Sequence, residues 1–299
     1  MISEGTPVLS TIVVCRNAAA TILACLRSVA TDDPRCELIV VDSSEDRTPE
    51  LVRSEFPQTR LVHSTRRLYP GEARNTGAAQ ARGRIIAFID ADCIASPGWT
   101  DAVIAAHELH PNVPIIGGTV DNATPHSIIG TVSYFCEFSQ WAPERRERYM
   151  DQLPTCCFSI KREALAKLGP FPDGGYCSDT VLQWRVDLPQ QILFMVSFGV
   201  AHINLTHAAS FVAKFTRHGR YFARARVAHF RFSLPRRLLH VVTAPALPWL
   251  LFARRFGWLL RKRYDVTRFL VCAPLVLLGL ACWSLGEVNG YLEPAKETT

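Results

Sequence analysis

The sequence predicts an α/β fold with a mostly parallel sheet flanked by helices. Short runs of β-branched and apolar residues alternate with helical patterns through the first 120 residues, which is typical of a sheet covered on both faces. Hydrophobic residues make up 48% of the 299 residues and charged residues 20%, which is enough for a sizeable core and excludes a globally disordered chain.

The elements of this first part have recognisable boundaries. Asn17 is a possible cap for the first helix, Pro57 stops the second, and Gly83 closes the third. The expected strands are 9–15, 37–41, 60–63, 84–89 and 114–119, and the expected helices are 18–29, 48–56, 71–82 and 97–110. The chain beyond residue 120 is less regular, and its expected elements are a helix at 179–186, a strand at 191–200 and a long basic helix at 208–232.

Polar residues follow the predicted strands at their carboxyl ends, where ligands bind in such sheets. They are Arg16 with Asn17, the segment 42–46, and Asp90 with Asp92. Two carboxylates two positions apart, directly after a buried strand, could hold Mg²⁺ or Mn²⁺ and, through the cation, a diphosphate. Taken alone, the pair is equally typical of a surface turn.

Five stretches together resemble the family 2 glycosyltransferases, which have the GT-A fold, a Rossmann-like nucleotide-diphosphosugar transferase fold. The resemblance covers about residues 1–230, and the motifs agree in order, spacing and strand context. The stretches are the opening strand with its Asn (11–17), the second strand with its acidic turn (40–48), the G-x-A-R-N-x-G helix (71–77), the strand ending in D-x-D (81–92) and a segment similar to R-x-A-L-x-x-x-G-x-F (161–171).

The resemblance implies a UDP- or GDP-linked sugar as donor, Mg²⁺ or Mn²⁺ as cofactor, and Asp92 as a metal ligand. The donor-binding residues that it implies are Asn17, Asp42 at the nucleotide base, Asp46 supporting that loop, Arg74 and Asn75 near the ribose and diphosphate, and Asp90 at the ribose. From the residues alone, Asp42 could be a plain turn residue, and Arg74 and Asn75 could form a helix-face salt bridge and a cap.

The same resemblance implies that Asp179 is the general base for the acceptor hydroxyl, although Ser178 stands where the family has Glu. Asp179 could also cap the following helix. His202 lies near the place where some relatives supply a further metal ligand, and otherwise it would be a core or loop histidine. Arg217 and Arg220 correspond to a basic element over the leaving diphosphate, or they could face a membrane.

The end of the chain is basic and apolar. Residues 214–268 contain 14 Lys and Arg and one acid, Asp265, which favours an anionic lipid surface over nucleic acid as the partner. Uncharged runs occupy 238–253 and 269–286, and the second would be roughly 27 Å long as a helix. The positive-inside tendency favours one crossing by the second run, with two crossings or a peripheral hairpin as alternatives.

Targeting and redox signals point to a reducing compartment. The first residues show neither a basic nor an apolar leader segment, so we expect the protein at the cytoplasmic face of the inner membrane. The ten cysteines form neither a C-x-x-C pair nor a zinc spacing, so we expect reduced, mostly buried thiols.

The predicted activity is an inverting, metal-dependent sugar transfer to a membrane or lipid-linked acceptor. The predicted organisation is a nucleotide-sugar half (1–120), an acceptor and catalytic half of the same domain (121–232), and membrane-associated helices with a tail (233–299). One alternative is an inactive, nucleotide-sugar-binding membrane scaffold, which the serine at 178 would explain. Nucleotidyl transfer is disfavoured because no Gly-rich, Lys-bearing phosphate loop follows the first strand.

Overall fold

The computed structural model describes residues 6–173, 175–187 and 190–293, and these divide into two compact units. The first unit comprises Met1–Asp121 and Arg145–His202, and the second comprises Asn122–Glu144 and Ile203–Thr299, each over its described residues. One of these divisions lies one residue from the predicted boundary at 120, whereas the predicted boundary at 232 lies inside the second unit.

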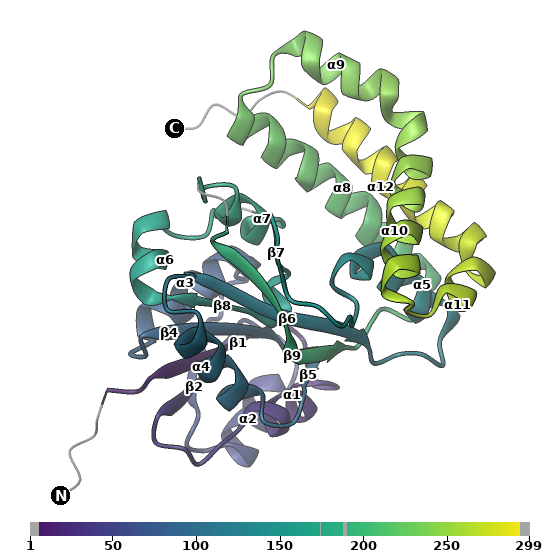
Figure 1. The fold of residues 1–299 in the computed structure, drawn as a ribbon. Coiled ribbons are helices and arrows are strands. Elements are labelled where there is room, and N and C mark those ends of the chain that lie inside the picture. Colours follow the sequence, from purple (N-terminus) through teal and green to yellow (C-terminus); the bar gives the residue numbers. More distant parts are fainter. Residues whose placement is uncertain (1–5, 174, 188–189, 294–299) are drawn as a thin grey trace, which may run out of the picture. The chain divides into compact units, whose positions relative to one another are not determined.

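The first unit contains a mixed sheet of nine described strands in the order β3-β2-β1-β4-β8-β6-β9-β5, with β7 beside β9 (Figure 1). β1, β2, β3, β4 and β6 run in one direction, because the first four pair in parallel and β6 and β4 are each antiparallel to β8. The strands are β1 (Leu9–Cys15), β2 (Cys36–Asp42), β3 (Arg60–His63), β4 (Ile85–Asp90), β5 (Cys93–Ala95), β6 (Ile115–Asn122), β7 (Arg148–Tyr149), β8 (Phe158–Lys161) and β9 (Ile192–His202).

Helices cover this sheet, and the predicted fold class is confirmed. They are α1 (Ile22–Val29), α2 (Thr48–Glu55), α3 (Pro70–Gln80), α4 (Trp99–Leu109), α6 (Arg162–Leu168) and α7 (Ser178–Gln183). The core is formed by the apolar residues of the central strands, of which Ile12, Val40 and Phe88 are wholly buried. Burial on both faces explains why these strands are continuous apolar runs in the sequence.

Two residues predicted to bound helices, Asn17 and Gly83, do not do so. The first helix begins at Ile22 with Thr21 at the cap position, because Asn17 has a left-handed backbone (φ 52°) and bonds to the turn after β2. The third helix ends at Gln80, before Gly83. Gly83 instead lies against β1, where a Cβ would come within 2.6 Å of the Ser10 backbone nitrogen, so a larger residue would not fit.

The second unit is helical, with α5 (Ile128–Glu137), α8 (Ala208–Phe230), α9 (Leu234–Thr243), α10 (Leu247–Lys262), α11 (Val266–Val271) and α12 (Ala273–Leu292). The uncharged run 238–253 is therefore divided between two helices, which join at a 3₁₀ turn over Ala244–Ala246. Pro245 and Pro248 lie at this junction because proline lacks the N–H that an uninterrupted helix requires.

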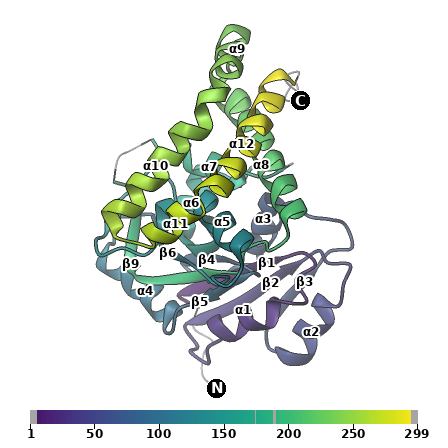
Figure 2. The ribbon, with the colours of Figure 1, turned by 90° about the vertical axis from the view of Figure 1, so that its right-hand side faces the viewer.

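α8 and α12 pack side by side with their backbones in close contact (Figure 2). A Cβ at Gly286 would lie 2.0 Å from the Thr216 carbonyl oxygen, and one at Gly219 would lie 2.1 Å from that of Trp283. Only glycine permits this approach. α12 also buries Glu287, whose carboxylate lies 3.8 Å from the Arg226 guanidinium of α8.

Candidate active site

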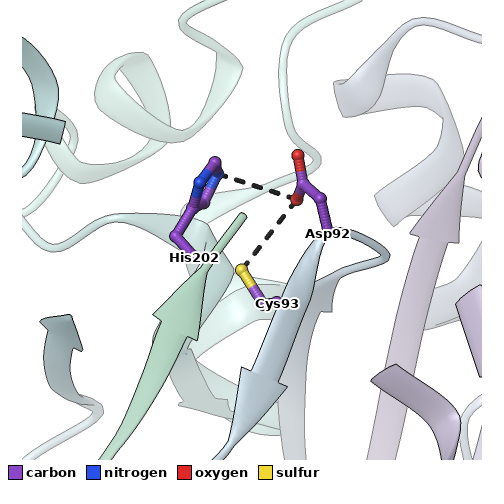
Figure 3. Close-up of side chains that lie close together, drawn as sticks. All are labelled: Asp92, Cys93 and His202. Carbon is purple, nitrogen blue, oxygen red and sulfur yellow. Dashed lines mark hydrogen bonds and ion pairs between the residues drawn. The ribbon is translucent and has the colours of Figure 1, made fainter. Parts of the chain in front are cut away.

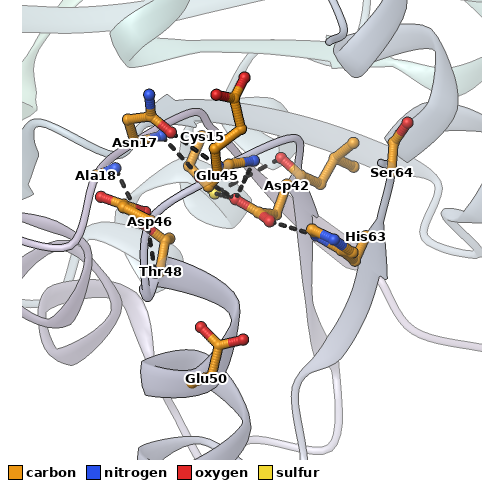
Figure 4. A network of polar contacts seen from close by, with 12 residues as sticks. Cys15, Asn17, Ala18, Asp42, Glu45, Asp46, Thr48, Glu50, His63 and Ser64 are labelled. Carbon is orange, nitrogen blue, oxygen red and sulfur yellow. Dashed lines mark hydrogen bonds and ion pairs between the residues drawn. The ribbon is translucent and has the colours of Figure 1, made fainter. Parts of the chain in front are cut away.

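A network of hydrogen bonds lies at the carboxyl ends of β1, β2 and β3 (Figure 4). Asp42, the last residue of β2, has no exposed surface. Its Oδ1 accepts hydrogen bonds from the Ser44 hydroxyl (2.5 Å) and the Cys15 thiol (3.2 Å), and its Oδ2 accepts from Nδ1 of His63 (2.6 Å). Register places Asp42 opposite both Cys15 and His63, so the pairing of three parallel strands assembles this network.

This arrangement limits how Asp42 could contact a nucleotide base, the role predicted for it. Asp42 has no exposed surface, so among the described residues its outer partners are the ones that solvent reaches. His63, whose side chain is 27% exposed, is the member with a second ring nitrogen not used by Asp42. Sequence reasoning missed His63, because an edge strand of four residues gives no sign of which residue faces the next strand end.

Asn17 and Asp46 hold the loops beside this network. The Asn17 side-chain oxygen accepts from the Glu45 backbone N–H (2.9 Å), and Asp46 accepts from the Thr48 backbone N–H (3.0 Å) and from the Ala19 N–H (3.2 Å). Burial opposes ionisation of Asp46, but the hydrogen bonds from Thr48 and Ala19 together lower its pKa. These hydrogen bonds tie Asp46 to its loop, and the donor-site roles of Asp46 and Asn17 stay predictions.

The end of β4 carries an ion pair whose arginine is buried and whose aspartate is partly exposed. Arg74 of α3 is 5% exposed, and its Nη2 donates to Oδ1 of Asp90 at 3.1 Å. Its Nη1 donates to the hydroxyl of buried Ser178 at 3.5 Å. Ser178 is the residue that stands where the family has Glu. Burial raises the pKa of the Asp90 carboxyl, and the guanidinium of Arg74 opposes this rise. Arg74 therefore forms a salt bridge, as considered above, and this salt bridge joins α3 to the end of β4. Its contact with Ser178 joins α3 to α7.

Asn75 has a structural contact on the neighbouring face of α3. Its side-chain nitrogen donates to the Phe171 carbonyl (2.8 Å), and its oxygen accepts from the Phe171 N–H (2.9 Å). Both ends of the amide therefore hold the segment before α7. Its role near the donor stays a prediction.

Asp92, Cys93 and His202 converge just beyond β4 (Figure 3). His202 Nε2 lies 3.6 Å from Asp92 Oδ1, the Cys93 thiol lies 3.9 Å from the same oxygen, and the three ligand atoms lie within 4.8 Å of one another. The structure therefore brings together the two predicted metal ligands, which are 110 positions apart in the chain. Carboxylate, imidazole and thiol are all ligands for divalent cations, so this donor set fits the implied metal.

Cys93 is the member of this group that sequence reasoning missed. It is opposite His202 in the antiparallel pair β5–β9, and residues directly opposite one another project from the same face. β5 is only three residues long and follows a turn, so neither its existence nor its partner strand could be predicted from hydrophobic periodicity.

Asp179 lies in the first turn of α7 and is partly buried. Its Oδ2 accepts from the Thr155 hydroxyl at 3.3 Å, and its Oδ1 accepts from the Thr180 N–H at 2.8 Å. The cap position itself belongs to Cys177, which has a left-handed backbone (φ 70°), so the alternative of Asp179 as the helix cap is wrong. Its role as general base stays a prediction.

Arg217 and Arg220 both lie on α8, in the second unit. Arg220 forms an ion pair with Glu293, which raises its pKa. The contact predicted for both residues with the leaving diphosphate stays a prediction.

Comparison with known proteins identifies the family. The sequence profile described as "Glycosyl transferase family 2" matches residues 10–169, more than half of the chain, and these residues include every strand end discussed above except that of β9. The chain belongs to glycosyl transferase family 2. The resemblance deduced from the motifs is thereby confirmed for the family and for the class of enzyme.

Curated relatives agree over parts of their length. The chain is 26% identical over 175 residues to glycosyltransferase AglE of Haloferax volcanii, covering 56% of this chain and 57% of that protein. It is 39% identical over 97 residues to the succinoglycan biosynthesis protein ExoO of Rhizobium meliloti, covering 31% of this chain and 28% of that protein. The matched regions thus span about half of the first relative and about a quarter of the second.

Solved structures support the GT-A fold of the family. The mannosyltransferase PcManGT of Pyrobaculum calidifontis, in complex with GDP-Man and Mn²⁺, aligns with a TM-score of 0.59 at 20% identity, covering 94% of this chain and 87% of that chain. TarS (residues 1–349) of S. aureus, in complex with UDP-GlcNAc, aligns with a TM-score of 0.54 at 17% identity, covering 94% and 90%. At these identities the likeness is one of fold.

Proposed function

We propose that this protein transfers a sugar, with inversion, from a UDP- or GDP-linked donor to a lipid-linked or membrane-sited acceptor. The observation that carries the proposal is the convergence of Asp92 and His202 next to the Arg74–Asp90 pair at the end of β4. The family membership supports the reaction class. The ends of parallel strands are also where ligands bind in α/β sheets.

Asp92 and His202 would hold a divalent cation, Mg²⁺ or Mn²⁺, which would neutralise the charge that develops on the departing diphosphate. Arg74 orients Asp90 through its buried guanidinium, so the Asp90 carboxylate is fixed for contact with the ribose. The Asp42–His63 network would contact the nucleotide base through His63, whose side chain is partly exposed.

Asp179 would accept the proton of the acceptor hydroxyl. The acceptor oxygen then forms a bond to the anomeric carbon while the bond from that carbon to the diphosphate oxygen breaks on the opposite face. One displacement inverts the anomeric carbon and releases a nucleoside diphosphate. A hydrogen bond from Thr155 holds one Asp179 oxygen, which orients the carboxylate.

The test is a donor screen on membranes containing the full chain, with UDP- and GDP-sugars, Mg²⁺ or Mn²⁺, and a lipid extract as acceptor. We expect one donor to release its nucleoside diphosphate, and Asp92→Ala and Asp179→Asn to abolish this release. Glu50→Gln, at an exposed site on α2, is the matched control and should leave it unchanged. Tight donor binding without release from any donor would support the inactive scaffold instead.

The membrane component of the proposal rests on the second unit. One helix among the described residues, Ala273–Leu292, is long and apolar enough to cross a bilayer, and 44% of its apolar window is buried within the structure. By itself this is weak support, because buried helices of soluble proteins have the same properties. To cross alone, α12 would also have to lose its glycine contacts and its Glu287–Arg226 pair with the basic helix α8.

We therefore propose association with the bilayer surface, at the cytoplasmic face of the inner membrane. α9, α10 and α11 expose large apolar side chains together with arginines, the combination that binds an anionic lipid interface. The most exposed of these apolar side chains are Leu234, Leu239, Val242, Trp249, Leu250 and Val271.

Flotation with anionic vesicles tests this proposal on the full chain. Truncation after residue 232 is unsuitable, because it would remove the partner helix of α8. We expect Val242→Glu combined with Trp249→Glu to release the protein from vesicles. Leu109→Glu, at an equally exposed apolar site of the first unit, should not. Equal flotation of all three proteins would refute the surface role of these helices.

A further inference from the structure

The group at the end of β4 contains one potential ligand more than the carboxylate–imidazole pair proposed above. The Cys93 thiol lies 3.9 Å from Asp92 Oδ1, on the same face of the β5–β9 pair as His202. All three ligand atoms lie within 4.8 Å of one another. Cys93 is a free thiol and is fully buried, so its sulfur is shielded from bulk water, and it lies beside Cys156 as well as beside Asp92.

These spacings are close to those of a three-ligand metal site. Bond lengths of about 2.3 Å to sulfur and about 2.0–2.1 Å to nitrogen or oxygen, at tetrahedral angles, place ligand atoms about 3.4–3.6 Å apart. The two separations from Asp92 Oδ1, 3.6 Å and 3.9 Å, exceed this by a few tenths of an ångström, and the separation between the Cys93 and His202 ligand atoms is at most 4.8 Å. Because Asp92 has a side chain that is 46% exposed, it can move by this amount and still leave an open position toward solvent.

We propose that Cys93 is a third protein ligand of the divalent cation, and that its sulfur gives the site a preference for thiophilic cations such as Zn²⁺, Co²⁺ and Cd²⁺ over Mg²⁺. This inference rests on the proposed function, because it concerns the same cation site. Thiolate favours soft and borderline cations, whereas Mg²⁺ prefers oxygen ligands. On binding, the S–H bond breaks, a sulfur–metal bond forms, and the proton passes to the buffer.

The test is a Co²⁺ titration of the purified full chain, with and without UDP, followed by the near-ultraviolet thiolate-to-cobalt charge-transfer absorption. We expect this absorption in the unmodified protein and in Cys157→Ser, a control that removes a buried free thiol outside the group. We expect it to be absent in Cys93→Ser. Competition with Zn²⁺ should remove it, whereas Mg²⁺ at the same concentration should not.

Affinity provides a second readout. Cys93→Ser should weaken Zn²⁺ binding, measured by calorimetry, by on the order of 10–100-fold, with little change for Mg²⁺. Co²⁺ binding without charge-transfer absorption, no Co²⁺ binding at all, or an unchanged spectrum in Cys93→Ser would each overturn the proposal. These outcomes are independent of sugar transfer, which the Mg²⁺- or Mn²⁺-dependent donor screen measures separately.

Discussion

The carboxylates of Asp42, at the end of β2, and of Asp92, just after β4, differ in the hydrogen bonds that they accept and in their exposure to solvent. Asp42 is wholly buried, and both of its oxygens accept hydrogen bonds from protein groups. The Asp92 side chain is 46% exposed, and its Oδ1 lies 3.6 Å from His202 Nε2 and 3.9 Å from the Cys93 thiol. The Asp42 carboxylate is thus held by protein groups inside the fold, whereas the Asp92 carboxylate is open to solvent and to a ligand.

The same pattern, a strand followed by an aspartate, therefore serves two purposes in one sheet. A buried charge is stable only when hydrogen bonds compensate for its lost hydration, and Asp42 obtains these from two flanking strands and its own turn. A carboxylate that binds a cation must keep free lone pairs and access to solvent. Four substitutions test this distinction.

Asp92→Ala should have the largest effect on activity. Removal of the carboxylate takes away the main charge of the cation site, and we expect sugar transfer to fall by about 100-fold or more. Because the side chain is half exposed, the free energy of unfolding should change by less than about 0.5 kcal/mol. Enzyme assays and urea denaturation of the same preparation measure both quantities. A destabilised Asp92→Ala protein would contradict the distinction.

Asp42→Ala should show the opposite pattern, with a large effect on stability. The substitution leaves the buried donors of Ser44, Cys15 and His63 without their acceptor, and we expect a loss of about 2–4 kcal/mol in the free energy of unfolding. Urea denaturation monitored by circular dichroism provides the measurement. If the midpoint matched that of the unmodified protein, the network would be incidental to folding.

His63→Ala should have an intermediate effect, because the residue is shared between the network and the pocket. We expect a loss of about 1 kcal/mol in stability and a rise of about fivefold in the dissociation constant for the nucleoside diphosphate. Calorimetric titration of UDP or GDP gives the second value. His126→Ala, at an exposed site in the second unit, is the control. Weaker binding by both variants would show that the effect is not specific to the β3 end.

Asp46→Asn should have the smallest effect and one that depends on pH. The folded pKa of Asp46 is lowered, so its stabilising contribution is present above the unfolded pKa and is lost as pH falls through the folded value. The group is exposed, so we expect only about 0.5 kcal/mol near neutral pH. Stability of the two proteins should converge in acid. A constant difference down to the acid transition would assign the effect to geometry instead of charge.

The fold class, the family and the carboxyl ends of β1, β2, β3 and β4 could be predicted from the sequence, whereas the short strands β5, β7 and β8 could not. Continuous apolar runs require burial on both faces, and the polar residues that end them, such as Asp42 and Asp90, must then lie at one edge. These are local properties, so periodicity and motif spacing reveal them. The same reasoning located His202 only by analogy with relatives.

Which side chains contact one another depends on the tertiary structure. Cys93 faces His202, and His63 bonds to Asp42, because of strand pairings between segments that are far apart or too short to recognise. The break between α9 and α10, and the close contact of α12 with α8 at Gly286, also depend on packing. Contacts of this kind are set by register and by the backbone approach of distant segments, and a single sequence carries no local signal for either.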